Sequence, residues 1–329
     1  MLTILILPIV IAALHFGKFL LIPLLFSFFI FILLKSLNEK IITKTQMNHN
    51  FSFIVVCSTL IIFFYLLGIL IERNIENVIS QSDIYQLNFE KVVTYIESQN
   101  LGVVISLSKN IINNINFNFI FSNILNTLTN IAGNLSLILV LLIFILLEEK
   151  FLITKFNKLN LDRSFKTIFF KIKNQIYDYF QIKLMTSGLT GVLSFIILFL
   201  FSSDLSIFFG ILAFLLNFIP FIGSLIAVIL PFVFSLIQKL DLINSLFLFI
   251  TLLVSQVLVG NFIEPKIMGK SLNLSPVIML ITLSILGKLW GISGMFLSVP
   301  ILVILLITFA NFKKTRKIAI LISEKGNIS

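Results

Sequence analysis

The stretch SLFLFITLLVSQVLVGNFIEPKIMG, residues 245–269, decides the fold class. Its first part, residues 245–262, carries no charge, and Glu264, Pro265 and Lys266 follow directly. A helix that crosses a bilayer needs about 20 mostly apolar residues. A charged side chain at the bilayer centre costs roughly 3 kcal/mol, and proline removes a backbone donor. The stretch therefore predicts a membrane helix followed by a boundary or a working site.

The composition of the whole chain indicates the same environment. Of 329 residues, 58% are hydrophobic and 12% are charged, against about 25% charged in an ordinary soluble domain. Backbone amides in lipid must be satisfied within the segment, which leaves helices and closed barrels, and apolar runs without two-residue alternation exclude the barrel. We expect an all-α, polytopic integral membrane protein with about 8–10 apolar helical segments.

Basic residues orient these segments, because lysine and arginine near the ends of membrane helices gather on the cytoplasmic side. Three basic clusters, within residues 35–44, 150–183 and 313–317, agree with one orientation. We therefore predict that both termini are cytoplasmic. The predicted parts are N-terminal membrane helices (1–71), an extracytoplasmic amphipathic helical region (72–130), a membrane helix (131–147), a basic cytoplasmic helical region (148–185), a C-terminal membrane core (186–312) and a cytoplasmic tail (313–329).

The extracytoplasmic region has apolar residues at loosely helical spacing among polar ones. This pattern is typical of a helix that lies on a membrane surface or on a neighbouring subunit. A small packed helical cap is the alternative. A second copy of the chain is therefore left open as a partner.

Two stretches of the C-terminal core share a layout, residues 205–231 and residues 274–300. Each begins with Leu-Ser, breaks near its middle at glycine or proline, and ends in proline at the same offset. Their arms of about 11 to 17 residues suit re-entrant or broken hairpins whose tips stop inside the membrane. If the two enter from opposite sides, they have the inverted topology that is common in transporters. Two ordinary crossing hairpins are the alternative.

Three motifs resemble those of the autoinducer-2 exporter family, which includes PerM-type permeases. They are GILAFLLNFIPFIG at residues 210–223, NFIEPKIMG at residues 261–269, and the glycine-rich ending at residues 274–300. The likeness is strong over residues 177–312 and weak before them. Ser224 departs from the pattern, because the turn of the family usually continues with proline there. Its loss loosens the turn, although Pro220 and Gly223 keep the main constraints.

The resemblance implies a secondary carrier in the bacterial inner (plasma) membrane that works without ATP hydrolysis. Such a permease would export a small polar solute, autoinducer-2 or a similar signalling molecule, by alternating access. Exchange of sodium for protons is the alternative within transport. A membrane scaffold that recruits partners through residues 72–130 is the alternative of another class. The substrate, the direction, the coupling ion and the number of subunits stay open.

Polar residues within or beside the apolar runs are the candidates for transport and coupling. An intramembrane carboxylate such as Glu264 can exchange a proton as access alternates, although a helix-end glutamate paired with Lys266 is the plainer alternative. Asn217, Gln256 and Asn261 can hydrogen-bond a polar solute or a dehydrated cation, or simply join helices.

Residues that break helices are the candidates for a gate or an unwound ion site. Helix breaking and close packing explain them equally well. They are Pro220, Gly223, Pro265, Gly269, Gly287, Gly291, Gly294 and Pro300.

Other functions are disfavoured. The patterns GxxxxGK[ST], HExxH and GxSxG are absent, which argues against an enzyme, and His15 and His49 are too far apart to form a metal pair by spacing. The net charge of +10 lies mainly in clusters that flank membrane helices, so we expect contacts with the lipid bilayer and none with nucleic acid. No cofactor is expected beyond a coupling ion, Na⁺ or H⁺.

Overall fold

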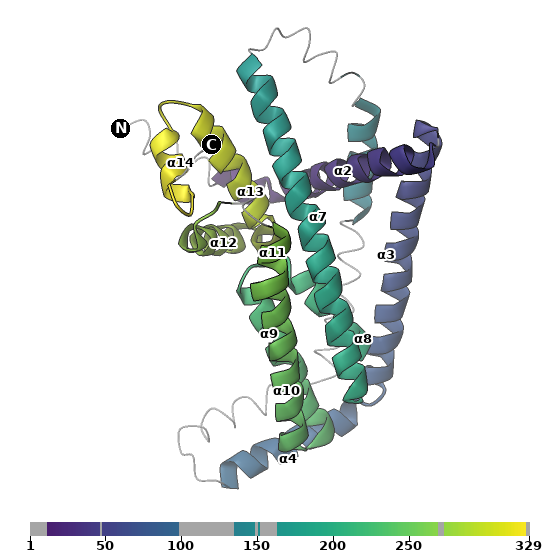
Figure 1. Ribbon diagram of the computed structural model, residues 1–329. Helices are drawn as coiled ribbons and strands as arrows, with labels where there is room; N and C mark the ends of the chain where they lie inside the picture. The colour runs from purple at the N-terminus through teal and green to yellow at the C-terminus, as the bar shows by residue number, and fades with distance from the viewer. Residues whose placement is uncertain are drawn as a thin grey trace. The chain divides into compact units, whose positions relative to one another are not determined.

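The computed structural model describes residues 12–46, 48–98, 135–148, 151, 163–268 and 273–326. Every regular element in these ranges is a helix (Figure 1), and the extended pairing found there is an isolated antiparallel bridge between Leu274 and Ser323. The helices include α2 (Lys18–Thr45), α3 (His49–Ile79), α4 (Ser82–Ser98), α7 (Arg163–Leu200), α8 (Ser206–Leu216), α9 (Ile222–Lys239), α10 (Leu242–Val257), the π-helix η1 (Leu258–Ile263), α11 (Glu264–Met268), α12 (Pro276–Trp290), α13 (Ile292–Asn311) and α14 (Arg316–Ile322).

The expectation of an all-α, polytopic membrane protein is confirmed. Five helices of the described ranges are long and apolar enough to cross a membrane: Lys18–Thr45, Thr167–Leu200, Ile222–Lys239, Leu242–Ile267 and Ile292–Asn311. Shorter apolar helices are Leu135–Glu148, Ser206–Leu216 and Pro276–Trp290. Each C-terminal hairpin thus joins a short first arm, α8 or α12, to a second arm, α9 or α13, that is long enough to span.

The helix that carries the NFIEPKIMG motif does not end at Glu264. It continues through η1 into α11 and remains helical to Met268. The amide of Glu264 donates to the carbonyl of Val259, five residues back, which is the bond of a π-turn. Pro265 lacks an N–H group, and its ring would clash with a carbonyl of the preceding α-turn. The wider π-turn accommodates the proline without a break.

The described chain divides into two compact units. Unit 1 is formed within residues 1–60, 132–183 and 267–329, and unit 2 within residues 61–131 and 184–266. The boundaries fall inside α3 and α7, so neither unit is continuous in sequence. The two C-terminal hairpins belong to different units.

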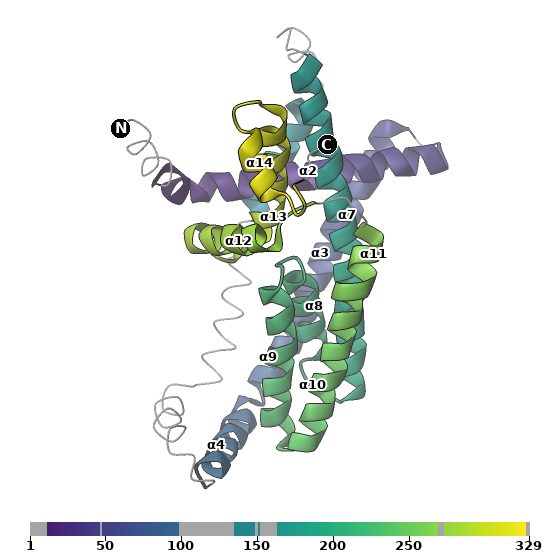
Figure 2. The same cartoon turned by 60° about the vertical axis from the view of Figure 1, so that its left-hand side comes forward.

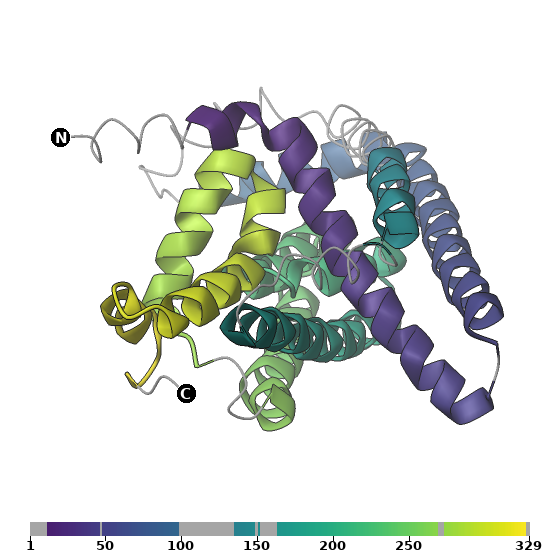
Figure 3. The same cartoon turned by 90° about the horizontal axis from the view of Figure 1, so that it is seen from above.

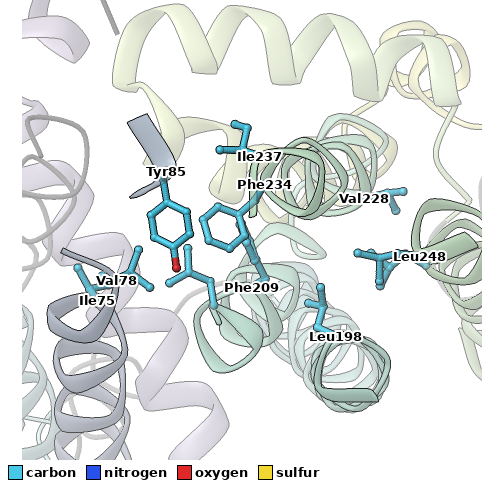
Figure 4. Close-up of a cluster of buried hydrophobic side chains, with 11 residues drawn as sticks. Ile75, Val78, Tyr85, Leu198, Phe209, Val228, Phe234, Ile237 and Leu248 are labelled. Carbon is cyan, nitrogen blue, oxygen red and sulfur yellow. The ribbon is translucent and has the colours of Figure 1, made fainter. Parts of the chain in front are cut away.

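Unit 2 contains the α8–α9 hairpin, with α10 beside α9 (Figure 2). Its core joins the end of α3 and the helix α4 to α7, α8, α9 and α10 (Figure 4). Tyr85 of α4 is almost fully buried, and its ring centroid lies 5.3 Å from that of Phe234 in α9. Of the two alternatives for residues 72–130, predicted to be extracytoplasmic, the packed cap describes α4. Residues 99–130 lie outside the described ranges.

Unit 1 contains the α12–α13 hairpin, with α2 alongside it (Figure 3). Aromatic rings connect its helices: Phe29 of α2 lies 5.1 Å from Phe180 of α7, and Phe26 lies 5.3 Å from Phe296 of α13, measured between ring centroids. The indole N–H of Trp290 donates to the carbonyl of Leu14 at 2.9 Å. These contacts pack the end of α12 against the first described residues.

Candidate transport site

A chain of hydrogen bonds between neutral side chains crosses unit 2. Asn217 follows the last residue of α8 and is 6% exposed. Its amide Nδ2 donates to Oγ of Ser187 on α7 at 3.0 Å, and Nε2 of Gln256 on α10 donates to its Oδ1 at 3.3 Å. The chain therefore links three helices that are far apart in sequence. Asn217 and Gln256 were separate candidates from the sequence, and the structure brings them together.

Ser187 was missed by sequence analysis. It is fully buried, and Thr186, Thr190 and Ser194 are buried on the same helix. The run TSGLTG at residues 186–191 is the signal that was available, because small and hydroxyl residues let membrane helices approach closely. Gly191 shows the effect: a Cβ atom there would lie 2.9 Å from the carbonyl oxygen of Gly210 in α8.

The turn that follows Asn217 is strained. The amide of Ile222 donates to the carbonyl of Pro220 at 2.7 Å, and Phe221 between them has φ 61° and ψ −60°. These values describe a γ-turn of the rare, unfavourable kind. A non-glycine residue in such a conformation costs about 1–3 kcal/mol and persists only where its surroundings enforce it. The strain therefore lies at the tip of the α8–α9 hairpin, beside the polar chain.

Gly223 holds this tip closed. A Cβ atom at its position would lie 1.8 Å from the carbonyl oxygen of Leu216, which no side chain tolerates. Ser224, which departs from the family pattern, donates its hydroxyl to the carbonyl of Phe221 at 2.8 Å. That bond supplies part of the constraint that a proline ring would have provided.

The tip of the other hairpin, in unit 1, also has a residue with positive φ and a glycine packed against a backbone carbonyl. Gly291 precedes α13 with φ 65°, and a Cβ at Gly294 would lie 2.0 Å from the carbonyl oxygen of Leu286. A Cβ at Gly287 would lie 2.8 Å from Cε of Met295. Positive φ before the second helix and a glycine against the first helix thus recur, which supports the predicted repeat.

The remaining predicted residues divide between the units. Asn261 is exposed in η1, Glu264 is half-buried at the start of α11, and Pro265 is exposed. They follow Gln256 in one continuous helix of unit 2 but are not members of the Ser187–Asn217–Gln256 chain. Pro300 is buried inside α13 of unit 1. Gly269 lies outside the described ranges.

A second polar cluster, also missed by sequence analysis, holds α3 and α4 to the α7–α8 loop. The hydroxyl of Tyr85 donates to Oδ2 of Asp204 at 2.5 Å, and Nδ2 of Asn74 donates to the carbonyl of Asp204 at 3.0 Å. Oε1 of Gln238, on α9, accepts from the amide of Asp204 at 3.3 Å. Burial, with the hydrogen bond to and the charge of Asp204, raises the pKa of Tyr85. The cluster fixes the cap formed by α4.

Comparisons with known proteins show which family the chain resembles. The family model described as "AI-2E family transporter" matches residues 3–314. A Borreliella burgdorferi protein named "Putative transport protein" is 38% identical over 217 residues, which cover 62% of this chain and 59% of that protein. The AI-2 transport protein TqsA of Escherichia coli K12 is 30% identical over 207 residues, which cover 62% and 60%. The chain thus spans about three fifths of the length of these two relatives.

A third relative aligns over nearly its whole length. It is a Haemophilus influenzae protein, also named "Putative transport protein", which is 28% identical over 341 residues that cover 96% of this chain and 93% of that protein. The family match extends well beyond the C-terminal motifs on which the sequence resemblance rested. Because the family model covers nearly the whole chain, this multi-pass membrane protein belongs to the AI-2E transporter family.

Proposed function

We propose that this protein is a secondary transporter that exports a small polar solute of the autoinducer-2 kind by alternating access. The observation that carries the proposal is the Ser187–Asn217–Gln256 chain, buried at Ser187 and Asn217 and half-buried at Gln256, beside the strained turn of the α8–α9 hairpin. The Escherichia coli relative is named an AI-2 transport protein, which makes autoinducer-2 the first substrate to test.

The chemistry of the chain suits a neutral, hydroxyl-bearing solute. Amides and hydroxyls donate and accept without carrying charge, so they can exchange a bond with each other for a bond with the solute. The bond between Gln256 and Asn217 is the longer of the two, and Gln256 is half-buried. We place the first contact with solute at Gln256, which would release Asn217 when solute binds.

The turn at Pro220–Ile222 supports the mechanical part of the proposal. A strained backbone held by its surroundings has another conformation within a few kcal/mol, which is what an alternating gate needs. Asn217 connects the turn to the chain, because it stands between α8 and Pro220. A change in the hydrogen bonds of Asn217 would shift the equilibrium between the two conformations of the turn. We assign the gate to Pro220 and Gly223, and its counterpart to Gly287, Gly291, Gly294 and Pro300.

Exchange of sodium for protons is the second candidate, and Glu264 favours it. This carboxylate is half-buried and directly follows a π-helix, an irregular turn that is frequent at functional sites. The carboxylate would carry the coupling proton. An export mechanism driven by a proton gradient would need the same group, so the two candidates differ in whether an organic solute must be present.

The test is flux through the purified protein in liposomes. Labelled autoinducer-2 trapped inside should leave faster when a proton or sodium gradient is imposed, and Asn217→Leu should abolish the acceleration. Asn244→Leu is the matched control, because Asn244 is exposed in the first turn of α10. Leakage that ignores the gradient and is equal in both variants would exclude a carrier.

The same liposomes separate the second candidate. A pH-sensitive dye in the lumen should respond to sodium without any organic solute if the protein is an antiporter, and Glu264→Gln should remove the response. A response that needs the organic solute supports the exporter. A dye signal unchanged by Glu264→Gln would remove Glu264 from the mechanism.

A further inference from the structure

The segment after α13 carries a dense positive charge. Lys313, Lys314, Arg316 and Lys317 are all exposed, and no acidic residue stands between Asn311 and Glu324. Clusters of this density next to a membrane helix are attracted to the negative surface of anionic lipids. The cluster directly follows a helix that is long enough to span, so it lies where head groups would be met.

The short helix α14 adds apolar side chains to this charge. Ala319 and Ile322 are buried, whereas Ile318 is 46%, Ile320 is 44% and Leu321 is 72% exposed. Ile318 and Leu321 are three residues apart and therefore lie on one face of the helix. Lys317 and Leu321, four residues apart, are also neighbours on its surface. Basic groups beside exposed aliphatic groups are typical of a helix that lies in a membrane interface.

The helix is not a loose tail. The amide of Ser275 donates to the carbonyl of Ile322 at 2.9 Å, and the amide of Glu324 donates to the carbonyl of Asn273 at 3.2 Å. These bonds flank the bridge between Leu274 and Ser323. Thr315 secures the other end, since its hydroxyl donates to the carbonyl of Phe309 at 3.1 Å. In Figure 1, α14 lies beside α13.

We infer that residues 313–322 form a docking surface for anionic phospholipid, which holds the start of α12 at the membrane interface. The basic side chains bind the phosphates, and Ile318 and Leu321 enter the acyl region. Because the bonds at Asn273 and Ser275 connect α14 to α12, lipid bound at α14 restrains the α12–α13 hairpin. The exposed aliphatic groups distinguish this surface from one for free phosphate or nucleic acid, which would leave them in water.

The test measures lipid binding to the full-length protein in a neutral detergent, with fluorescent phosphatidylglycerol and phosphatidylcholine as probes. We expect clear preference for phosphatidylglycerol. The variant K313Q/K314Q/R316Q/K317Q should weaken that binding at least about tenfold. The matched control K150Q/K155Q/K158Q/K166Q removes the same charge from the predicted basic region 148–185 and should change it less than about twofold. Equal loss in both would mean general attraction of charge and would overturn the assignment.

Two further arms distinguish lipid from phosphate and binding from misfolding. Ile318→Ser with Leu321→Ser should weaken phosphatidylglycerol binding while all charges remain, and glycerol 3-phosphate should not compete. Full competition by glycerol 3-phosphate, or no effect of the serine changes, would overturn the lipid assignment. Trp290 is the only tryptophan of the chain and lies at the end of α12. Its emission should be unchanged in every lipid-free variant. With phosphatidylglycerol it should shift in the wild type and in the K150Q/K155Q/K158Q/K166Q control, and not in K313Q/K314Q/R316Q/K317Q.

Discussion

The amide of Asn217 both donates and accepts in the interior of unit 2, so the polar chain depends on this residue. Ser187, its partner on α7, is fully buried, whereas Gln256 on α10 is half-buried. A buried polar group that loses its partner costs about 1–3 kcal/mol. The side chain therefore contributes to stability as well as to the proposed binding of solute.

Removing the partner of Asn217 should expose that cost. Ser187→Ala removes the hydroxyl that accepts from Nδ2 of Asn217, and we expect the free energy of unfolding in detergent to fall by about 1–2 kcal/mol. Ser284→Ala is the matched control, because Ser284 is exposed and bonds only to the carbonyl one turn back at Leu280. Denaturant titration followed by circular dichroism measures both. Equal effects of the two changes would mean that the bond between Ser187 and Asn217 does not stabilise the protein.

Gly223 offers a sharper residue-scale prediction. Its Cβ would lie 1.8 Å from a backbone oxygen that cannot rotate away, so Gly223→Ala should destabilise the protein by about 2–4 kcal/mol. At Gly188, in α7, a Cβ meets nothing within 4 Å, and alanine should there stabilise the helix by about 0.5–1 kcal/mol. Opposite signs in thermal unfolding are expected. A neutral Gly223→Ala would mean that the tip is open.

At the scale of elements, Tyr85 is the buried aromatic side chain that joins α4 to the rest of unit 2. Tyr85 packs on Phe234 and donates to Asp204, and its pKa is raised by burial and by that carboxylate. A phenol whose folded pKa exceeds its unfolded pKa contributes stability that is fully present below the unfolded value, about 10, and is lost as the pH rises through the folded value. The contribution of Tyr85 to the stability of the cap is therefore constant up to alkaline pH.

This argument predicts a pH profile. Unfolding midpoints should be level up to about pH 10 and then fall, and Tyr85→Phe should remove part of that fall. The same change should lower stability by about 1–2 kcal/mol at neutral pH, because Asp204 loses a donor. Tyr65→Phe, at an exposed position of α3, should keep the wild-type profile. Identical pH profiles for the two variants would mean that the bond between Tyr85 and Asp204 does not stabilise α4.

The two hairpins show which features of a helix hairpin can be predicted from glycine and proline positions. Their glycine and proline positions predicted turns, and the structure has turns at Pro220–Ile222 and at Gly291. The arm lengths were predicted only in part, because α9 and α13 continue through Pro231 and Pro300 without ending. Helix continuation past a proline depends on packing around the freed carbonyl, which a local pattern does not contain.

At the scale of the molecule, the two units interleave in sequence, and each contains one of the two similar hairpins. The predicted parts, from residues 1–71 to the tail, follow the chain instead. The orientation of those parts remains a proposal: both termini in the cytoplasm of a bacterial cell, with residues 72–130 outside the inner membrane.

The orientation can be tested directly, because Cys57 is the only cysteine. In a Cys57→Ser background, a cysteine replacing Asp83 should react with an impermeant maleimide in intact cells, and one replacing Lys314 only in everted vesicles. Both native side chains are exposed. Labelling of both positions from the same side would reverse or abolish the proposed topology.

The sequence by itself determined the membrane environment, the helical fold and the family, because apolar composition, helix breakers and the NFIEPKIMG motif are local properties of the chain. Only the tertiary structure decided which polar residues meet. Asn217 is 30 residues from Ser187 and 39 from Gln256, and packing of α7, α8 and α10 brings them together. Glu264 follows Gln256 closely in sequence yet stays outside the chain. Helix packing is a long-range balance of many small contacts, so no single segment encodes it.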